Sequence, residues 1–189
     1  MRLKIDKVCI GLAGYPGSGK TLLASEAVKR GIPVLNMGDV VREEALRRGL
    51  QPTRENMTLL MWRLRSEEGP LAVAKRILEK SRCFREHMIV VDGLRTIDEM
   101  SFFRENFKKF ILVVVDASKE ERFKRLSKRG RSDDPKDIQD LEDRDRAEDA
   151  LGLSELLKKG DKIILNEGPP EKALEEFKRI LEDVARLNS

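Results

Sequence analysis

The chain has 189 residues, carries 38 Lys and Arg against 34 Asp and Glu, and has a formal net charge of +4. This length favours a single domain over residues 1–189 with a substantial core, and the mixed charges with 5% aromatic residues argue against nucleic acid as the main substrate. No apolar run approaches the ~20 residues of a membrane-spanning helix, and the two cysteines form no CxxC pair, so we expect a cytoplasmic protein without a membrane partner.

The first predicted strand, residues 8–13, leads directly into Gly14-x4-Gly19-Lys20-Thr21, which matches the phosphate-loop pattern. Such a loop turns its backbone N–H groups toward phosphate oxygens, and the N-terminus of the helix that follows adds positive charge. We expect Lys20 to reach the β- and γ-phosphates of ATP and Thr21 to offer its hydroxyl to Mg²⁺. The predicted nucleotide-binding residues are Gly14, Tyr15, Pro16, Gly17, Ser18, Gly19, Lys20 and Thr21.

Strand-like and helical patterns continue to alternate after this loop. Short apolar runs predict further strands at residues 32–35, 88–91, 110–115 and 162–165. Helical spacing lies between these runs, and a final helix is predicted at residues 170–187. We expect an α/β fold of the P-loop NTPase class, a three-layer sandwich around a five-stranded parallel sheet with strand order 2-3-1-4-5.

Two regions break the alternation, and insertions of this kind commonly lie at the carboxyl edge of a parallel sheet, where ligands bind. The first, about 39–82, shows apolar residues at helical spacing from Met57 to Leu64 and a further helix opened by Pro70. It is the predicted acceptor-binding lobe. The second, about 128–148, is strongly charged and is predicted to form a short lid.

The third and fourth strands are each followed by an informative pattern. Asp92 comes directly after the third strand, which in this fold class lies beside the phosphate loop, so its carboxylate can bind Mg²⁺ directly or through water. Ser118 and Glu121 follow the fourth strand with the spacing of a capping box. That pattern predicts a helix that ends near Gly130.

Several classes of nucleotide-binding protein are excluded by missing motifs. The guanine-reading Asn-Lys-x-Asp and the ABC signature Leu-Ser-Gly-Gly-Gln do not occur, and the chain is too short for a typical AAA module with its C-terminal lid. Arginines instead follow the predicted carboxyl ends of the strands, and a guanidinium pairs bidentately with phosphate. These arginines are Arg42, Arg95, Arg129, Arg131, Arg144 and Arg146.

Three segments, in this order, resemble adenylate kinases. "MGDVVREEA" resembles the segment in which a Gly-Asp pair precedes an arginine that holds the acceptor's phosphate. "VVDGLRT" is similar to their Asp-Gly-Phe-Pro-Arg-Thr with one residue deleted, and "RLSKRGRSDD" is similar to their lid. A fourth segment, "GDKIILNEGPPEKALEEF", resembles the end of dephospho-coenzyme-A kinases. The resemblance spans nearly the whole chain and is closest to a poorly characterised archaeal group of adenylate-kinase-related phosphate-loop proteins.

The resemblance implies roles for the matching residues. The implied acceptor-binding residues are Asp39, Arg42, Arg95, Glu99 and Arg144. The implied catalytic residues are Lys20, Asp92, Arg129 and Arg131, and the implied metal ligands are Thr21 and Asp92. Adenylate kinases carry an adenine-reading glutamine at the position of Glu99, whereas a carboxylate accepts hydrogen bonds but cannot donate them unless protonated. The base of the acceptor is therefore left open.

The sequence as a whole predicts an ATP- and Mg²⁺-dependent phosphotransferase whose acceptor is nucleotide-like and already carries phosphate. A nucleoside monophosphate is the first choice of acceptor, and dephospho-coenzyme A is the alternative. A different class also stays open, a kinase-like NTPase that serves as an assembly or RNA-processing factor. Arg42 and Arg95 discriminate between the classes, because only phosphoryl transfer to a small acceptor requires them.

Overall fold

The computed structural model describes residues 4–130 and 134–186. Its centre is a parallel sheet with strand order β2-β3-β1-β4-β5, which confirms the predicted fold class and strand order. The strands are rich in Val and Ile, and the three central strands are largely buried on both faces, as expected where helices cover a parallel sheet, whereas the two edge strands are less buried. Their bounds are β1 (Ile5–Ala13), β2 (Val34–Asn36), β3 (Met88–Asp92), β4 (Phe107–Asp116) and β5 (Lys162–Leu165).

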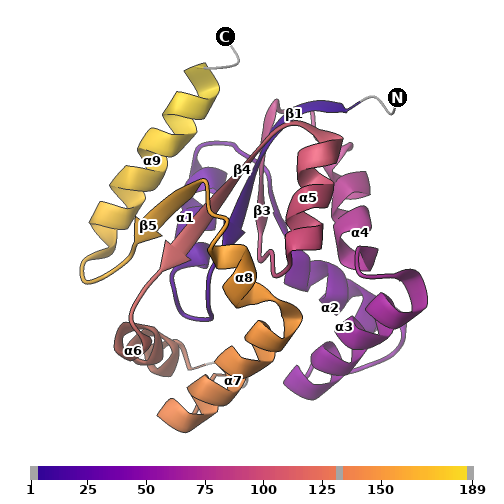
Figure 1. The fold of residues 1–189 in the computed structure, drawn as a ribbon, viewed down its shortest axis with the longest axis vertical. Helices are drawn as coiled ribbons and strands as arrows, with labels where there is room; N and C mark the ends of the chain where they lie inside the picture. Colours follow the sequence, from indigo (N-terminus) through magenta and orange to yellow (C-terminus); the bar gives the residue numbers. More distant parts are fainter. Residues whose placement is uncertain (1–3, 131–133, 187–189) are drawn as a thin grey trace.

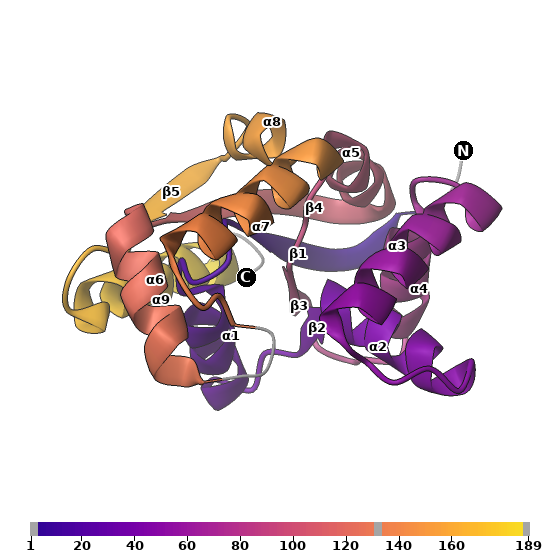
Figure 2. The same ribbon diagram turned by 90° about the horizontal axis from the view of Figure 1, so that it is seen from below.

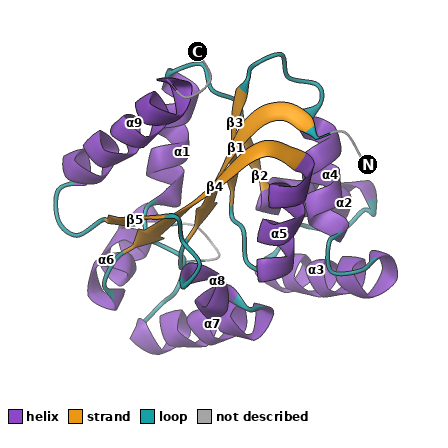
Figure 3. Cartoon of the chain, turned by 45° about the horizontal axis from the view of Figure 1, so that its top comes forward, coloured by secondary structure: helices purple, strands orange, loops and turns teal. Residues whose placement is uncertain are grey.

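Helices cover both faces of this sheet and divide the core in two (Figure 1, Figure 3). On β1, Val8 and Ile10 pack with α1 and α9, whereas Cys9 points into the core on the opposite face. This alternation follows from the two-residue period of a strand. One face is covered by α1 (Lys20–Lys29) and α9 (Pro170–Arg186), and the other by α2 (Met37–Arg47), α3 (Arg54–Glu68), α4 (Ala72–Ser81), α5 (Ile97–Asn106) and α8 (Leu153–Leu157).

Two helices lie apart from these layers, beyond the carboxyl edge of the sheet. They are α6 (Lys119–Arg129) and α7 (Ile138–Leu151), and Figure 2 shows them across from α2 and α3 with β1 and β3 between. The predicted lobe, about 39–82, contains α2 to α4, and the predicted lid, about 128–148, contains most of α7. Within the two described stretches, none of the helices combines the length and the apolar character that crossing a bilayer requires.

The helix caps differ from the prediction at one position. Ser118 Oγ accepts a 3.4 Å hydrogen bond from the backbone of Glu121, but the N–H of Ser118 donates to the carboxylate of Glu167 and not to Glu121. The predicted capping box at α6 is therefore only half formed. A complete capping box stands instead at the start of α5, where Thr96 and Glu99 each accept a backbone N–H from the other.

Candidate functional site

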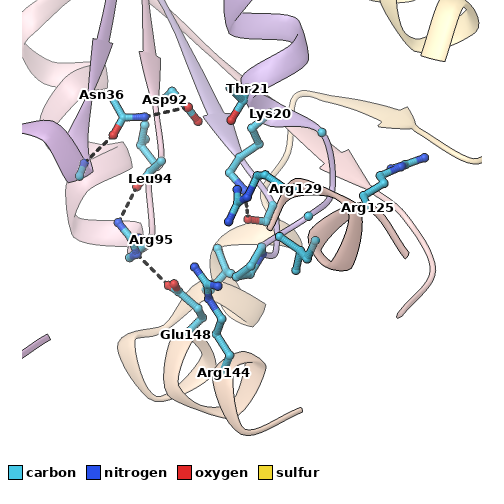
Figure 4. Close-up of a pocket in the computed structure, with 18 residues that line it drawn as sticks. Lys20, Thr21, Asn36, Asp92, Leu94, Arg95, Arg125, Arg129, Arg144 and Glu148 are labelled. Carbon is cyan, nitrogen blue, oxygen red and sulfur yellow. Dashed lines mark hydrogen bonds and ion pairs between the residues drawn. The ribbon is translucent and has the colours of Figure 1, made fainter. Parts of the chain in front are cut away.

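A cavity of about 300 Å³ opens at the carboxyl ends of β1, β2 and β3, bounded by the phosphate loop and by α6 and α7 (Figure 4). Its position agrees with the general placement of ligand sites in open α/β sheets. The structure brings together at this cavity a large part of the residues predicted from sequence. They are Gly14, Pro16, Gly17, Gly19, Lys20, Thr21, Asp92, Arg95, Arg129 and Arg144.

The phosphate loop is closely packed from behind by the segment after β5. Asn166 is buried, and its Nδ2 donates a 2.7 Å hydrogen bond to the carbonyl oxygen of Ser18. Gly19 has a φ of 109°, and a Cβ built there would lie 2.1 Å from Nδ2 of Asn166. Glycine is therefore required at position 19 for its conformation and for space. Arg125 of α6 completes this support by donating to Ser18 O at 3.3 Å and Asn166 O at 2.6 Å.

Lys20 lies at the centre of the cavity with its ammonium directed at the loop itself. Its Nζ donates to the carbonyl oxygens of Gly14 at 2.6 Å and Tyr15 at 3.0 Å. Burial lowers the pKa of Lys20 to about 8, although the nearby Asp92 carboxylate acts in the opposite direction. The lysine thus satisfies its hydrogen bonds within the loop, in the place where phosphate oxygens would compete for them.

Asp92 and Asn36 form a polar pair between the ends of β3 and β2 (Figure 4). Asn36 Nδ2 donates to Asp92 Oδ2 at 2.9 Å, and Asn36 Oδ1 accepts the N–H of Gly38 at 2.8 Å as the cap of α2. Burial raises the pKa of Asp92, and Lys20 partly counteracts this effect.

The other oxygen of Asp92, Oδ1, is buried and has no hydrogen-bond partner among the described residues. Buried polar atoms normally have partners, so an orphaned carboxylate oxygen at a cavity wall indicates a missing ligand. Thr21 lines the same cavity, and hydroxyl and carboxylate oxygens are the donors that Mg²⁺ prefers. The residues present therefore fit a magnesium ion, which Asp92 would hold directly or through water.

Arg95 reaches from the β3–α5 loop across the cavity to α7. Its Nε lies 2.7 Å from Oε2 of Glu148 on α7, and its Nη1 donates to Gly93 O at 3.2 Å. The ion pair with Glu148 raises the pKa of Arg95. Burial alone would raise the pKa of Glu148, but the Arg95 guanidinium holds it below its ordinary value.

A second set of polar contacts fastens α7 to the phosphate loop. Arg122 of α6 pairs bidentately with Asp145 of α7 at 2.6 and 2.9 Å, and its guanidinium lies 5.1 Å from the centre of the Tyr15 ring. Tyr15 in turn donates its hydroxyl to Asp149 at 2.7 Å. Tyr15 therefore supports the lid side of the loop, whereas the sequence pattern predicted it only as part of the nucleotide cradle.

Several predicted residues lie away from the cavity. Arg42 pairs with Asp39 on the half-exposed surface of α2, and neither residue lines the cavity. Glu99 is buried and bonds to Arg65 at 2.9 Å while its second oxygen accepts the N–H of Arg95 at 2.9 Å. Its carboxylate is thus used within the protein, and in this geometry it does not face the cavity where an acceptor would bind.

The four arginines of the predicted lid, about 128–148, fall into three groups. Arg129 and Arg144 line the cavity, and Arg129 Nε also lies 3.1 Å from Oδ2 of Asp134. Arg146 pairs with Asp143 on the exposed side of α7 and does not line the cavity. Arg131 lies outside the described residues, so its predicted catalytic role stays a prediction.

Sequence reasoning missed three polar residues at this cavity: Asn36, Arg125 and Glu148. Asn36 had a usable signal, because it is the first polar residue at the carboxyl end of the second strand. Glu148 follows Arg144 by four residues, which places both on one face of a helix. Arg125 carried no such signal, since it lies in a run of basic residues on a highly charged helix.

A family model and a curated relative both match most of this chain. A family model described as an AAA domain matches residues 13–142, which is more than half of the chain. UPF0200 protein TK1334 from Thermococcus kodakarensis is 40% identical over 177 residues, covering 92% of this chain and 96% of the relative.

Two solved structures share the fold at low identity. TT1252 from Thermus thermophilus superposes with a TM-score of 0.67 at 21% identity, covering 95% of this chain and 98% of that one. A shikimate kinase from Bacteroides thetaiotaomicron gives a TM-score of 0.59 at 18% identity, covering 94% and 98%. Together with the phosphate loop, the strand order and the match over nearly the full length, these findings show that the chain belongs to the UPF0200 family, an archaeal group with a P-loop kinase-like fold.

Proposed function

We propose that the protein is an ATP- and Mg²⁺-dependent phosphotransferase whose acceptor is a nucleotide-like molecule that already carries a phosphate. The observation that carries the proposal is the arrangement of one cavity. The phosphate loop with Lys20 forms one wall, and Arg95 lies across from it at the end of β3. Hydrolysis needs only the phosphate loop and Lys20. Transfer also needs a residue that holds a second molecule, which is the role proposed for Arg95.

The proposed reaction depends on alignment and charge neutralisation more than on covalent chemistry. The N–H groups of the phosphate loop and Lys20 would hold the β- and γ-phosphates of ATP, and Thr21 and Asp92 would hold Mg²⁺, which neutralises phosphate charge when bound. Arg129 and Arg144 reach the cavity from the lid side and would stabilise the transferring group. Closure of α7 over the cavity would exclude water as a competing acceptor.

The carboxylates at the cavity favour a phosphorylated acceptor over a neutral alcohol. An attacking hydroxyl needs a base within hydrogen-bond reach, whereas a phosphate oxygen is already an anion. Among the described residues that line the cavity, Asp92 and Glu148 are the carboxylates. Asp92 occupies the predicted metal position, and Glu148 is paired with Arg95. If Asp92 holds Mg²⁺ and Glu148 holds Arg95, both carboxylates are engaged, and an acceptor that needs no base fits the cavity better, which supports a nucleoside monophosphate as the first candidate acceptor.

Dephospho-coenzyme A is the second candidate acceptor. It is supported by the segment from Asp161 through β5 to Asn166, which resembles the end of dephospho-coenzyme-A kinases and packs against the phosphate loop through Asn166. The NTPase alternative predicts hydrolysis that no small acceptor stimulates.

The test is a screen of nucleoside monophosphates, dephospho-coenzyme A and unphosphorylated nucleosides with ATP and Mg²⁺, with products identified by mass. We expect one monophosphate to gain a phosphoryl group. Arg95→Ala should lower this transfer by about 100-fold and leave ATP affinity within about threefold. The matched control is Arg104→Ala, which removes an arginine from an ion pair with Asp161 outside the cavity. Only ADP and free phosphate across the whole screen would refute transfer and support the NTPase class.

A further inference from the structure

Glu148 is a carboxylate that lines the cavity together with several cationic side chains. It projects from α7 on the same face as Arg144 and reaches toward the β3–α5 loop (Figure 4). Its side chain is 15% exposed, and its partner Arg95 is 29% exposed, so solvent screens this ion pair only partly. The sequence patterns of this chain predicted no role for Glu148.

The charges around Glu148 are those expected around a bound phosphate. Lys20, Arg95 and Arg144 all stabilise its ionised form. Asp92, the other carboxylate among the described lining residues, lies at the end of β3, where one of its oxygens accepts a hydrogen bond from Asn36. Glu148 is the carboxylate that forms the ion pair with Arg95. It occupies the position of an anion that the site is otherwise equipped to bind.

Glu148 and the phosphate of an acceptor would compete for the same N–H groups of Arg95. A guanidinium binds an oxyanion most strongly when two N–H groups meet two oxygens along one edge. Glu148 takes the Nε of Arg95 at 2.7 Å, and Gly93 O takes Nη1 at 3.2 Å. An acceptor that binds the Nε edge of Arg95 with two oxygens must therefore displace Glu148 from Nε.

The attachment of α7 allows such a release without unfolding. Among the residues of α7, which are all described, Leu141 is the one that is fully buried. Little apolar surface therefore holds this helix in place. Asp145 and Asp149, on either side of Glu148, have partners of their own in Arg122 and Tyr15. The helix can therefore stay attached to the phosphate loop while the Glu148 side chain leaves Arg95.

We propose that Glu148 selects acceptors by charge, and this inference rests on the proposed function. A phosphate monoester, with up to two negative charges and three acceptor oxygens, gains more from Arg95 than Glu148 does and displaces it. A single carboxylate only matches Glu148, and a neutral acceptor cannot compete for Arg95. Glu148 is thus a specificity-determining residue that acts by occupying the acceptor's anchor.

The experiment compares wild type with Glu148→Gln, which has the same shape but no charge. The probes are a nucleoside monophosphate, the corresponding nucleoside and its 5′-carboxylate, titrated calorimetrically with a non-hydrolysable ATP analogue bound. In Glu148→Gln we expect about tenfold tighter binding of the monophosphate, the size of one charged hydrogen bond, and detectable binding of the carboxylate. Glu142→Gln is the matched control, because it makes the same change at a half-buried residue of α7 that pairs with Lys119 of α6 and does not line the cavity.

A double-mutant comparison assigns the effect to Arg95. In an Arg95→Ala background, Glu148→Gln should change the affinity of the monophosphate by less than about twofold. Unchanged or weaker monophosphate binding in Glu148→Gln with Arg95 intact would overturn the proposal, as would an equal gain without Arg95. If Glu148→Gln does not fold, Glu148→Asp withdraws the carboxylate by one methylene and should shift affinity in the same direction. Because these are binding measurements, the selecting role would stand even if the screen found no phosphoryl transfer.

Discussion

At the scale of single residues, the phosphate loop depends on a contact that its sequence pattern does not contain. Gly19 leaves room for the buried Asn166 amide, which bonds to Ser18 and cannot move aside without breaking that bond. We expect Gly19→Ala to weaken ATP binding by at least about 100-fold, because the loop must shift. Nucleotide affinity can be measured by calorimetry with Mg²⁺ present.

The matched control is Gly31→Ala after α1. Gly31 has a φ of 73° and nothing within 4 Å of a built Cβ, so alanine there meets only backbone strain. This change should lower the free energy of unfolding by about 1 kcal/mol and leave ATP affinity intact. Equal affinities for Gly19→Ala and wild type would contradict the packing argument.

Because the ammonium of Lys20 is buried, we expect nucleotide binding to depend on pH. Burial lowers its pKa to about 8, so above that pH the ligand-free protein holds a neutral amine, whereas bound phosphates favour the ammonium form. Binding then takes up a proton, and ATP affinity should be about tenfold weaker at pH 9 than at pH 7. Calorimetry in buffers of different ionisation enthalpy detects this proton. Lys20→Arg stays charged and should abolish the dependence, and a flat profile in wild type would contradict it.

At the scale of elements, α5 shows where a resemblance obscured a local signal. Thr96 and Glu99 have the spacing of a capping box, and the structure forms it. The likeness to adenylate kinases instead implied that Glu99 binds the acceptor. The sequence also gives no signal for the end of this helix, because α5 ends at Asn106 and β4 begins at Phe107 with no Gly or Pro between them.

Glu99→Gln separates the two interpretations of this residue. The carboxylate caps α5 and pairs with the nearly buried Arg65, so the change should lower the free energy of unfolding by about 1–3 kcal/mol. The KM for the acceptor should stay the same. Urea unfolding and steady-state kinetics measure the two quantities. Glu105→Gln, on the exposed side of α5, should affect neither, and a raised KM with unchanged stability would support the acceptor-reading role.

Local patterns explain why some elements were predictable and others were not. The strands and the phosphate loop are encoded by short runs whose neighbours in sequence supply the context. The predicted strand order agrees with the structure, in which the loop lies between β1 and α1. Glu148 and Arg125 depend on how α6 and α7 dock over the loop, which is set by contacts between residues far apart in the chain. A pattern could place arginines near the strand ends but could not say which of them face the cavity.

At the scale of the whole molecule, the helices α7 and α9 differ in how they are held against the rest of the protein. The helix α9 buries Ala173, Phe177, Ile180, Leu181 and Val184, whereas α7 buries Leu141 and is otherwise held by polar contacts. We expect amides in α7 to exchange with deuterium faster than those in α9, because local opening exposes less apolar surface there.

Nucleotide binding should change this contrast. A non-hydrolysable ATP analogue with Mg²⁺ should slow exchange in α7 by at least about tenfold, because Arg144 of α7 and Arg129 of α6 would gain phosphate contacts. Exchange in α9 serves as the internal control and should stay constant. Equal protection of both helices without nucleotide would contradict the view of α7 as a movable element. Mass spectrometry of peptic peptides resolves the two helices.

The direction of the strands also has a practical consequence. The first residue of β1 and the last residue of α9 lie at the amino edge of the sheet, on the far side of the molecule from the cavity (Figure 1). An affinity handle, a fluorophore or a surface linkage attached at either end would therefore leave the mouth of the cavity open to solvent. Immobilised protein should report small-molecule binding as faithfully as protein free in solution.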